Sequence, residues 1–226
     1  MAGTAIFDMD KTLTRSGTWS RYLFRVNRAR PSFYLQLPIL GLYAAAYKLG
    51  FCSRRVVKER GLRTLRWAQR SHLEQAAAAF ADAEVQHGLR RRTRSVLERH
   101  RAAGDQLVMA TAAADLVARP MADRLGMDLV ICTELERYAD GRLTGKLAGE
   151  NCYGLEKRRR LEEADHAQAF SRPLHGYSDH ITDRPFLDWV GRGVVVNPDR
   201  SFARIAREAG LPIEDWDKDD EGAKGP

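Results

Sequence analysis

Short apolar runs alternate with helical segments along most of this chain, and this alternation constrains its fold more than any other feature. Strands that alternate with helices are typical of a parallel sheet with helices on both faces. The sequence therefore predicts an α/β fold with a doubly wound parallel sheet. The expected strands are "TAIF" at residues 4–7, "DQLVMAT" at 105–111, "DLVICTELE" at 128–136, "PLHGYSD" at 173–179 and "GVVVNPD" at 193–199.

No strand pattern occurs between Gly17 and about Ala103, where several helical segments follow one another. This gap predicts a helical domain inserted after the first strand. The predicted division is a core of residues 1–15 and 104–216, an inserted helical domain of residues 16–103 and a tail of residues 217–226. The tail is expected to be flexible because the end of the chain, "EDWDKDDEGAKGP", is acidic and polar.

Local signals mark the ends of several helices. Pro31 can occupy the first turn of a helix, and Ser71 with Glu74 has the S-x-x-E spacing of a capping box. Asp140 and Gly141 form an Asp-Gly pair between alternating residues, which predicts a β-hairpin. Further helices are expected at residues 115–125, 156–169, 185–190 and 201–210, with glycines 88, 104, 126 and 210 at helix ends.

The composition is that of an ordinary globular protein in a reducing compartment. Of the 226 residues 44% are apolar, which is enough for a sizeable core without disulfides. The three cysteines are far apart and form no metal-binding or disulfide pattern. Asp8 and Asp10 interrupt any apolar run that could act as a signal peptide. A cytoplasmic location is expected.

The chain is basic, with a formal net charge of +7. Arginine-rich runs occur at residues 89–94 ("LRRRTR") and 157–163 ("KRRRLEE"). Such runs are either solvated helix faces or surfaces that attract anions, including nucleic acid and anionic lipid. No recognition-helix, zinc or RNA-binding aromatic signature is present, and no specific nucleic acid is expected as a partner.

Polar side chains stand where three of the predicted strands end. They are Asp8, Thr111 and Asp179, and Asp10 follows Asp8 after one residue. Ligands of such sheets bind beyond the carboxyl ends of the strands. Residues far apart in the sequence are therefore expected to face one crevice.

This set of residues favours phosphoryl transfer. Asp8 is the candidate nucleophile that forms an aspartyl-phosphate, and Asp10 can protonate the leaving alkoxide and then deprotonate water. Thr111, with the free N–H groups of a following helix start, can hold phosphate oxygens, and Lys157 can neutralise charge on the transferring group. The acidic pair in "DHITD", Asp179 and Asp183, completes with Asp8 a hard oxygen site suited to Mg²⁺.

These segments resemble the haloacid dehalogenase-like superfamily, in its phosphoserine-phosphatase-like branch (subfamily IB), over about residues 4–216. The matching segments are "DMDKTLT", "VMATAA", "NCYGLEKRRRL" and "GYSDHITDRPFL". The resemblance implies a Rossmann-like core with an inserted helical cap and a Mg²⁺-dependent phosphatase. The implied roles are catalytic for Asp8 and Asp10, phosphate-binding for Thr111 and Lys157, metal-binding for Asp8, Asp10 and Asp179, and metal-supporting for Asp183.

The sequence departs from the family pattern at three places. Lys11 stands where glycine is frequent, and alanines occupy positions 112–114, where a second small hydroxyl often occurs. Phosphoserine phosphatases carry a glutamate for the substrate amino group at the position of Gly17, and no acidic residue lies between Asp10 and Glu59. A substrate other than phosphoserine is therefore expected.

The stretch "PSFYLQLPILGLYAAAYKLGF" at residues 31–51 is unusually apolar. One interpretation is a buried helical hairpin in the cap. The other is contact with the anionic inner face of a membrane, helped by neighbouring arginines at positions 21, 25, 28, 30, 54 and 55. Because some relatives with apolar caps act on lipids, the resemblance leaves two substrate classes open: a small phosphorylated metabolite and a phospholipid monoester.

Two other functions remain open besides phosphatase activity. A non-catalytic protein that binds nucleic acid or membrane surfaces explains the positive charge but not the acidic residues at the strand ends. A phosphotransferase would use the same residues and pass the phosphoryl group to an alcohol instead of water.

Overall fold

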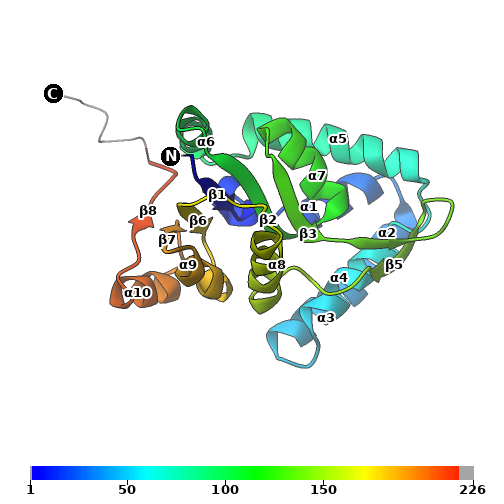
Figure 1. Cartoon of the computed structure of the whole chain (residues 1–226). Coiled ribbons are helices and arrows are strands. Elements are labelled where there is room, and N and C mark those ends of the chain that lie inside the picture. Colours follow the sequence, from blue (N-terminus) through cyan, green and yellow to red (C-terminus); the bar gives the residue numbers. More distant parts are fainter. Residues whose placement is uncertain (1, 219–226) are drawn as a thin grey trace.

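A parallel sheet forms the centre of the molecule (Figure 1). In the computed structural model, which describes residues 2–218, six strands lie in the order β3-β2-β1-β6-β7-β8, and every neighbouring pair is parallel. They are β1 Thr4–Phe7, β2 Gln106–Ala114, β3 Leu129–Thr133, β6 Leu174–Ser178, β7 Arg192–Val196 and β8 Ile213–Glu214. The predicted α/β class is confirmed.

Both faces of the sheet are buried, as the central strand β1 shows. Ala5 and Phe7 point into one apolar layer, which also holds Met109. Ile6 points into the other layer, together with Val108. Alternate residues of a strand face opposite sides, and a strand buried on both sides is apolar throughout. This is why the predicted strands are recognisable as continuous apolar runs.

Helices cover the two faces. α5 Arg70–His87, α6 Thr93–Ala102 and α7 Asp115–Leu125 contribute to the first layer, and α8 Leu155–His166, α9 Arg184–Val190 and α10 Arg200–Glu208 contribute to the second. The bounds of α7 agree with the predicted helix. Gly126 ends it with φ +62°, a left-handed conformation that glycine adopts without steric cost.

The helices that follow β1 are α1 Trp19–Asn27, α2 Pro31–Tyr34, α3 Leu37–Lys48 and α4 Arg54–Arg63, and α5 and α6 come after them. Pro31 occupies the first turn of α2 as predicted. The predicted capping box at Ser71 is wrong, because α5 begins at Arg70 and Gln69, two residues before Ser71, takes the N-cap position. Glu74 pairs instead with Arg70 at 2.6 Å, a side-chain contact one helical turn apart.

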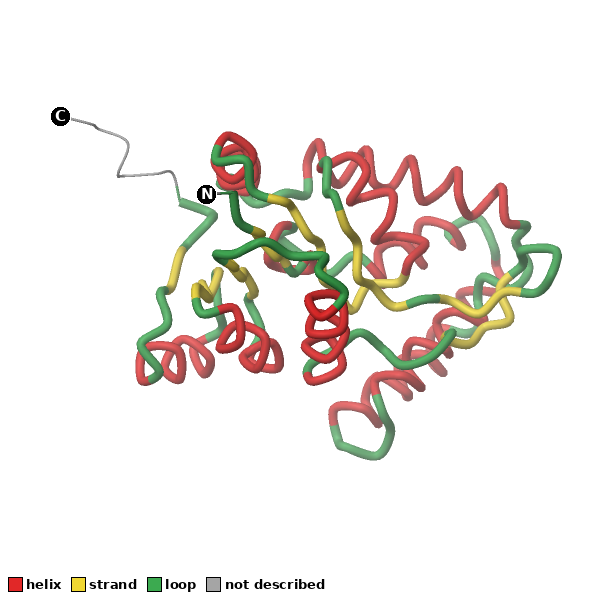
Figure 2. Tube along the Cα trace, viewed as in Figure 1, coloured by secondary structure: helices red, strands yellow, loops and turns green. Residues whose placement is uncertain are grey.

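Two predicted strands differ from the observed ones. β2 does not end at Thr111 but continues to Ala114, so α7 starts four residues after Thr111. The third predicted strand is divided into β3 and β4 Leu135–Arg137. β4 pairs antiparallel with β5 Leu143–Leu147, which confirms the predicted hairpin. In Figure 2 this hairpin reaches the inserted helices, where β5 contacts α4.

The structure continues to the end of the predicted core and into the first residue of the predicted tail. Glu214 belongs to β8, and Trp216 is completely buried, 5.5 Å from the ring centre of Tyr177. Asp217 forms an ion pair with the buried Arg90. Residues 219–226, the rest of the predicted tail, lie outside the described residues.

Apart from Phe33, the apolar stretch is not buried, so the hairpin interpretation is wrong in that respect. None of the twelve residues of α3 is buried. α3 packs beside α4, which also contacts β5, and the turn that joins α3 to α4 projects from the rest of the molecule (Figure 1). The exposed large apolar side chains of this segment are Tyr34, Leu35, Leu37, Ile39, Leu42, Tyr47, Leu49 and Phe51. Between residues 2 and 218, no helix combines the length and apolarity needed to cross a bilayer.

Candidate active site

Asp8 lies at the carboxyl end of the central strand β1, and the chain turns sharply after it. Its N–H donates to the carbonyl of Tyr177, which extends the pairing with β6 by one residue. The following turn, Met9–Leu13, is fixed by the buried side chains of Met9 and Leu13. Within it Lys11 has φ +64°, the left-handed region where glycine is favoured. This backbone conformation accounts for the glycine that is frequent at this position in the resembled family.

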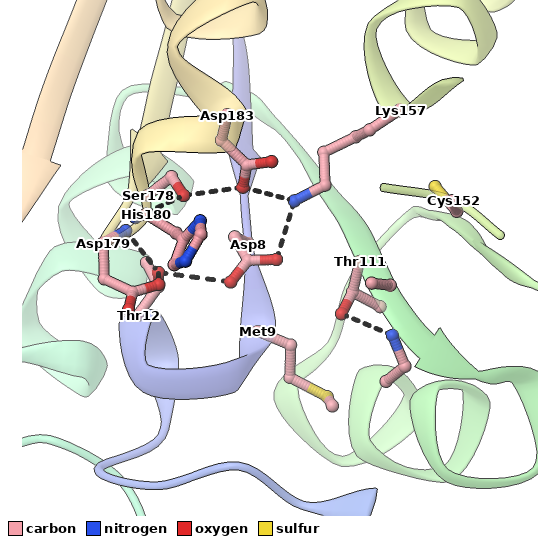
Figure 3. Close-up of polar contacts among 12 residues, drawn as sticks. Asp8, Met9, Thr12, Thr111, Cys152, Lys157, Ser178, Asp179, His180 and Asp183 are labelled. Atoms are coloured by element: carbon pink, nitrogen blue, oxygen red, sulfur yellow. Dashed lines mark hydrogen bonds and ion pairs between the residues drawn. The ribbon is translucent and has the colours of Figure 1, made fainter. Parts of the chain in front are cut away.

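Lys157 holds the Asp8 carboxylate from the side of α8 (Figure 3). Its Nζ donates to Asp8 Oδ1 at 2.8 Å and to Asp183 Oδ2 at 2.5 Å, and all three residues are buried. Ser178 donates to the same Asp183 oxygen at 2.7 Å. Two carboxylates therefore share one ammonium group, which leaves a net negative charge in a buried place.

Thr12 connects Asp8 with Asp179. Its hydroxyl lies 3.3 Å from Asp8 Oδ2 and 3.2 Å from Asp179 Oδ1, and it accepts the N–H of Asp179 at 3.0 Å. Figure 3 shows the two carboxylates on either side of this hydroxyl. Thr12 and Asp179, which are 167 positions apart in the sequence, thus meet at one edge of the sheet. This agrees with the prediction that the ends of the strands face one crevice.

Burial and neighbouring charges shift the pKa values of Asp8 and Lys157. The pKa of Asp8 is raised to about 7, chiefly by burial; Lys157 opposes this rise, and Asp183 and Asp179 contribute to it. Burial lowers the pKa of Lys157, but Asp183 and Asp8 outweigh this and hold it above its ordinary value. Lys157 therefore stays charged, and Asp8 takes up a proton readily when no metal ion is present.

The donors present fit Mg²⁺. Within residues 2–218 no three acidic, histidine or cysteine side chains are gathered as a ready-made metal cluster. Mg²⁺ does not need one, because it keeps several waters and uses one or two carboxylates together with substrate phosphate. Asp8 and Asp179 supply two carboxylates that share a hydroxyl neighbour, and the buried Asp183 Oδ1 has no hydrogen-bond partner within the protein.

Asp10 lies in the same cavity but has different partners. Its Oδ1 accepts the backbone N–H of Thr18 at 2.8 Å, a residue just before α1. Burial raises the pKa of Asp10 above the usual aspartate value, although the contacts with Thr18 lower it. A carboxyl group that keeps its proton nearer to neutral pH is suited to act as a general acid.

Thr111 is buried within β2, and its hydroxyl accepts the N–H of Ala113 at 3.1 Å (Figure 3). The strand does not end at Thr111 as predicted, so three further residues of β2 separate Thr111 from the predicted helix start at Asp115. N–H groups near Thr111 therefore belong to an irregular strand segment, where the register to β3 shifts between Ala110 and Ala114.

A cavity of about 170 Å³ brings the predicted residues together. All six predicted site residues line it: Asp8, Asp10, Thr111, Lys157, Asp179 and Asp183. Sequence reasoning missed Arg54 and Tyr153, which also line it; the Arg54 guanidinium lies 4.1 Å from the Tyr153 ring centre. It also missed Thr12, although its place four residues after Asp8 was a usable signal.

Comparison with known proteins agrees with this site. A sequence model of the haloacid dehalogenase-like hydrolase family matches residues 5–188. Protein CicA of Caulobacter vibrioides is 36% identical over 159 residues, 70% of each chain. The phosphoserine phosphatase SerB1 of Mycobacterium tuberculosis is 26% identical over 223 residues, 96% of this chain and 71% of that protein. The "Inhibition of morphological differentiation protein" of Streptomyces azureus is 34% identical over 54% of this chain, which spans only 44% of that protein.

Solved structures share the fold. A Bordetella pertussis protein of unknown function superposes with a TM-score of 0.84 at 24% identity, covering 96% of this chain and 99% of that one. A substrate-bound phosphoserine phosphatase superposes with a TM-score of 0.66 at 14% identity, covering 96% and 94%. The chain is therefore a hydrolase that belongs to the haloacid dehalogenase-like family, in its phosphoserine-phosphatase-like branch.

Proposed function

We propose that this protein hydrolyses phosphomonoesters in a Mg²⁺-dependent reaction with a covalent aspartyl-phosphate on Asp8. The observation that supports this most directly is the position of the Asp8 carboxylate. It is buried between Lys157 and Thr12, in one cavity with Asp10 and Thr111. A carboxylate fixed in this way can attack phosphorus without first losing rotational freedom.

The proposed reaction has two steps. Asp8 attacks phosphorus, the bond from phosphorus to the leaving oxygen breaks, and Asp10 gives its proton to the departing alkoxide. Asp10 then takes a proton from water as the water attacks the same phosphorus atom. The bond to Asp8 breaks, inorganic phosphate leaves, and the Asp8 carboxylate is restored.

The remaining site residues are proposed to stabilise the negative charge of the phosphoryl group. Lys157 and the Thr111 hydroxyl are proposed to hold phosphate oxygens as negative charge moves onto them. Mg²⁺, when bound, would supply the positive charge that lets an anionic carboxylate approach a phosphate dianion. Asp8 and Asp179 would hold it, with Asp10 as the third predicted ligand and Asp183 as support.

A small phosphorylated metabolite is the proposed substrate. The cavity of about 170 Å³ suits a phosphate with a small leaving group. The relative SerB1 is named a phosphoserine phosphatase, but Gly17, which lines this cavity, offers no carboxylate for an amino group. The cation Arg54 does line it, which favours a leaving group with a further negative charge.

A phospholipid monoester is the second proposed substrate, and exposure of the segment from Tyr34 to Phe51 supports it. Leu35 is 79% exposed and Phe51 is 82% exposed. Phe51 is three residues from Arg54, which lines the catalytic cavity. No acidic residue lies between Asp10 and Glu59, so this part of the inserted helices, proposed to act as a cap, could rest on an anionic lipid surface.

Liposome sedimentation tests this contact. The wild-type protein should pellet with phosphatidylglycerol-containing vesicles but not with pure phosphatidylcholine vesicles. The double variant Leu35→Ser, Phe51→Ser should lose most of this binding, while Tyr138→Ser, a change at an exposed aromatic residue outside the inserted helices, should not. Equal pelleting of all three proteins would contradict the contact.

Among the alternative functions, non-catalytic anion binding is less supported, because arginines of the 157–163 run are already paired. Arg158 pairs with Glu162, and Arg159 and Arg160 pair with Glu156. A phosphotransferase would use the same residues. Adding alcohols to the assay separates the two reactions, since a transferase would form new esters in place of inorganic phosphate.

Trapping the intermediate tests the main proposal. The protein is mixed with p-nitrophenyl phosphate and Mg²⁺, quenched in acid within milliseconds and digested. The peptide with Asp8 should carry a phosphoryl group that hydroxylamine removes. Turnover without a trapped phosphoryl group on Asp8 would exclude this residue as the nucleophile. No turnover of any phosphomonoester, with Mg²⁺ present, would exclude the function.

A further inference from the structure

Lys58 of helix α4 places a buried cation between the inserted helices and the sheet. Its side chain is nearly inaccessible to solvent, with 7% of the residue exposed. Nζ donates to the carbonyl of Ala112, to Asn151 Oδ1 at 2.5 Å and to Thr133 Oγ1 at 3.4 Å. All three acceptors are uncharged, and within residues 2–218 no carboxylate forms an ion pair with Lys58.

A buried cation without a counter-ion is unfavourable unless hydrogen bonds compensate for its lost hydration. Here the pKa of Lys58 is lowered to about 8, chiefly by burial and also by Arg54, while Asp10, Cys152 and Cys132 oppose this shift. A residue that only joins two elements could be apolar at lower cost. The contacts of the ammonium group must therefore explain why a lysine occupies this position.

One of those contacts leads to the phosphate-binding hydroxyl. The carbonyl of Ala112 and the N–H of Ala113 belong to a single planar peptide group. Lys58 binds the oxygen of this group, and the N–H at its other end donates to Thr111 Oγ1 at 3.1 Å. Thr133 also donates to the Ala112 oxygen, at 2.9 Å.

We infer that Lys58 is a positioning residue that orients Thr111 through the peptide group between Ala112 and Ala113. The cation fixes the plane of this peptide and polarises it, so that the N–H holds the Thr111 hydroxyl oxygen and the hydroxyl proton points to a phosphate oxygen. Phosphate binding then depends on whether α4 packs against the sheet, so that Lys58 reaches the carbonyl of Ala112. This inference rests on the proposed role of Thr111 in phosphate binding.

The contact is suited to this role because it joins segments far apart in the chain. α4 supplies Lys58, the irregular end of β2 supplies Ala112, and the loop before α8 supplies Asn151. α4 also supplies Arg54 to the catalytic cavity. Packing of α4 against the sheet would thus complete both the phosphate site and the part of the cavity that faces the leaving group.

A double-mutant cycle on phosphate affinity tests the inference. Inorganic phosphate is titrated calorimetrically into the Mg²⁺-loaded wild type, Lys58→Met, Thr111→Ala and the double variant. Each single change is expected to weaken phosphate binding about 10-fold. The double variant should bind about as weakly as Thr111→Ala, because Lys58 acts only through that hydroxyl. Lys58→Arg should recover part of the affinity, and the exposed Lys48→Met serves as the neutral control.

Independent effects, in which the double variant binds about 100-fold more weakly than wild type, would overturn the inference. If the wild type binds no phosphate at all, the proposed function fails, and the role of Lys58 in phosphate binding fails with it. If Lys58→Met does not fold, the amide resonance of Ala113 in the wild type provides the test. It should shift with pH as Lys58 titrates, near pH 8, and a resonance that does not respond would refute the connection.

Discussion

Lys157 Nζ lies 2.8 Å from Asp8 Oδ1 and 2.5 Å from Asp183 Oδ2, so two carboxylates share one buried ammonium group at the catalytic edge of the sheet. The three residues come from α8, from the end of β1 and from the short helical turn after β6. Their contact holds the nucleophile in place and also joins three segments of the core.

Lys157→Met should therefore be strongly destabilising as well as inactive. Removing one partner of a buried ion pair leaves the other charge without compensation, which typically costs about 3–5 kcal/mol. Urea unfolding at pH 8 measures the loss. Arg159→Met, at an exposed position of the same helix, should change the unfolding free energy by no more than about 0.5 kcal/mol. Equal stability of Lys157→Met and wild type would contradict the role of this ion pair.

Asp8→Asn should abolish turnover but leave the fold intact. The amide has the size of the carboxylate, and Lys157 keeps Asp183 as its partner. A loss of about 10⁶ in kcat is expected, on the scale seen when other hydrolases lose their nucleophile. Steady-state kinetics and circular dichroism check the two parts, with Asp188→Asn on the exposed face of α9 as control. Residual activity near the wild-type level would assign the nucleophile elsewhere.

Asp10→Asn should slow both formation and hydrolysis of the aspartyl-phosphate by about 10²–10⁴, because the amide can neither give nor accept the required proton. Rapid-quench measurements resolve the two steps. Esters with a better leaving group, such as p-nitrophenyl phosphate, should suffer less in the first step than alkyl phosphates, since their leaving oxygen needs little protonation. The same loss for both ester types would contradict a general acid at this position.

Removal of Mg²⁺ should have a pH-dependent effect on stability. The pKa of Asp8 is raised from 3.8 to about 7 in the metal-free folded protein. The folded state then binds a proton that the unfolded chain has released. The resulting contribution to stability is complete below pH 3.8 and is lost as the pH rises through about 7. Mg²⁺ replaces this proton, so it should stabilise the protein much more at about pH 8 than at about pH 5.5.

Thermal unfolding with Mg²⁺ and with EDTA at the two pH values measures this difference. In Asp8→Asn the response to Mg²⁺ should be smaller and should depend less on pH, because the carboxyl group with a pKa of about 7 is gone. An equal Mg²⁺-induced shift at both pH values in the wild type would show that Asp8 does not release a proton to the metal ion.

Much of the fold could be predicted because local patterns and burial agree. Ile6 and Phe7 face opposite apolar layers, so β1 is apolar throughout and easy to recognise. Gly126 marks the end of α7 because its left-handed backbone favours glycine. Prediction failed at Ser71, where the local capping signal is not used, and at Asp217, a residue of the predicted tail that pairs with Arg90, far away in the sequence.

The sequence by itself determined the sheet, the order of its elements and the identity of the acidic residues at its edge, because strand periodicity and strand ends are properties of neighbouring residues. Only the tertiary structure decided that Thr12 connects Asp8 with Asp179, that Lys58 reaches Ala112, and that α3 stays exposed. These relationships depend on distances between segments far apart in the chain. Such distances follow from how the helices pack on the sheet, which no local pattern encodes.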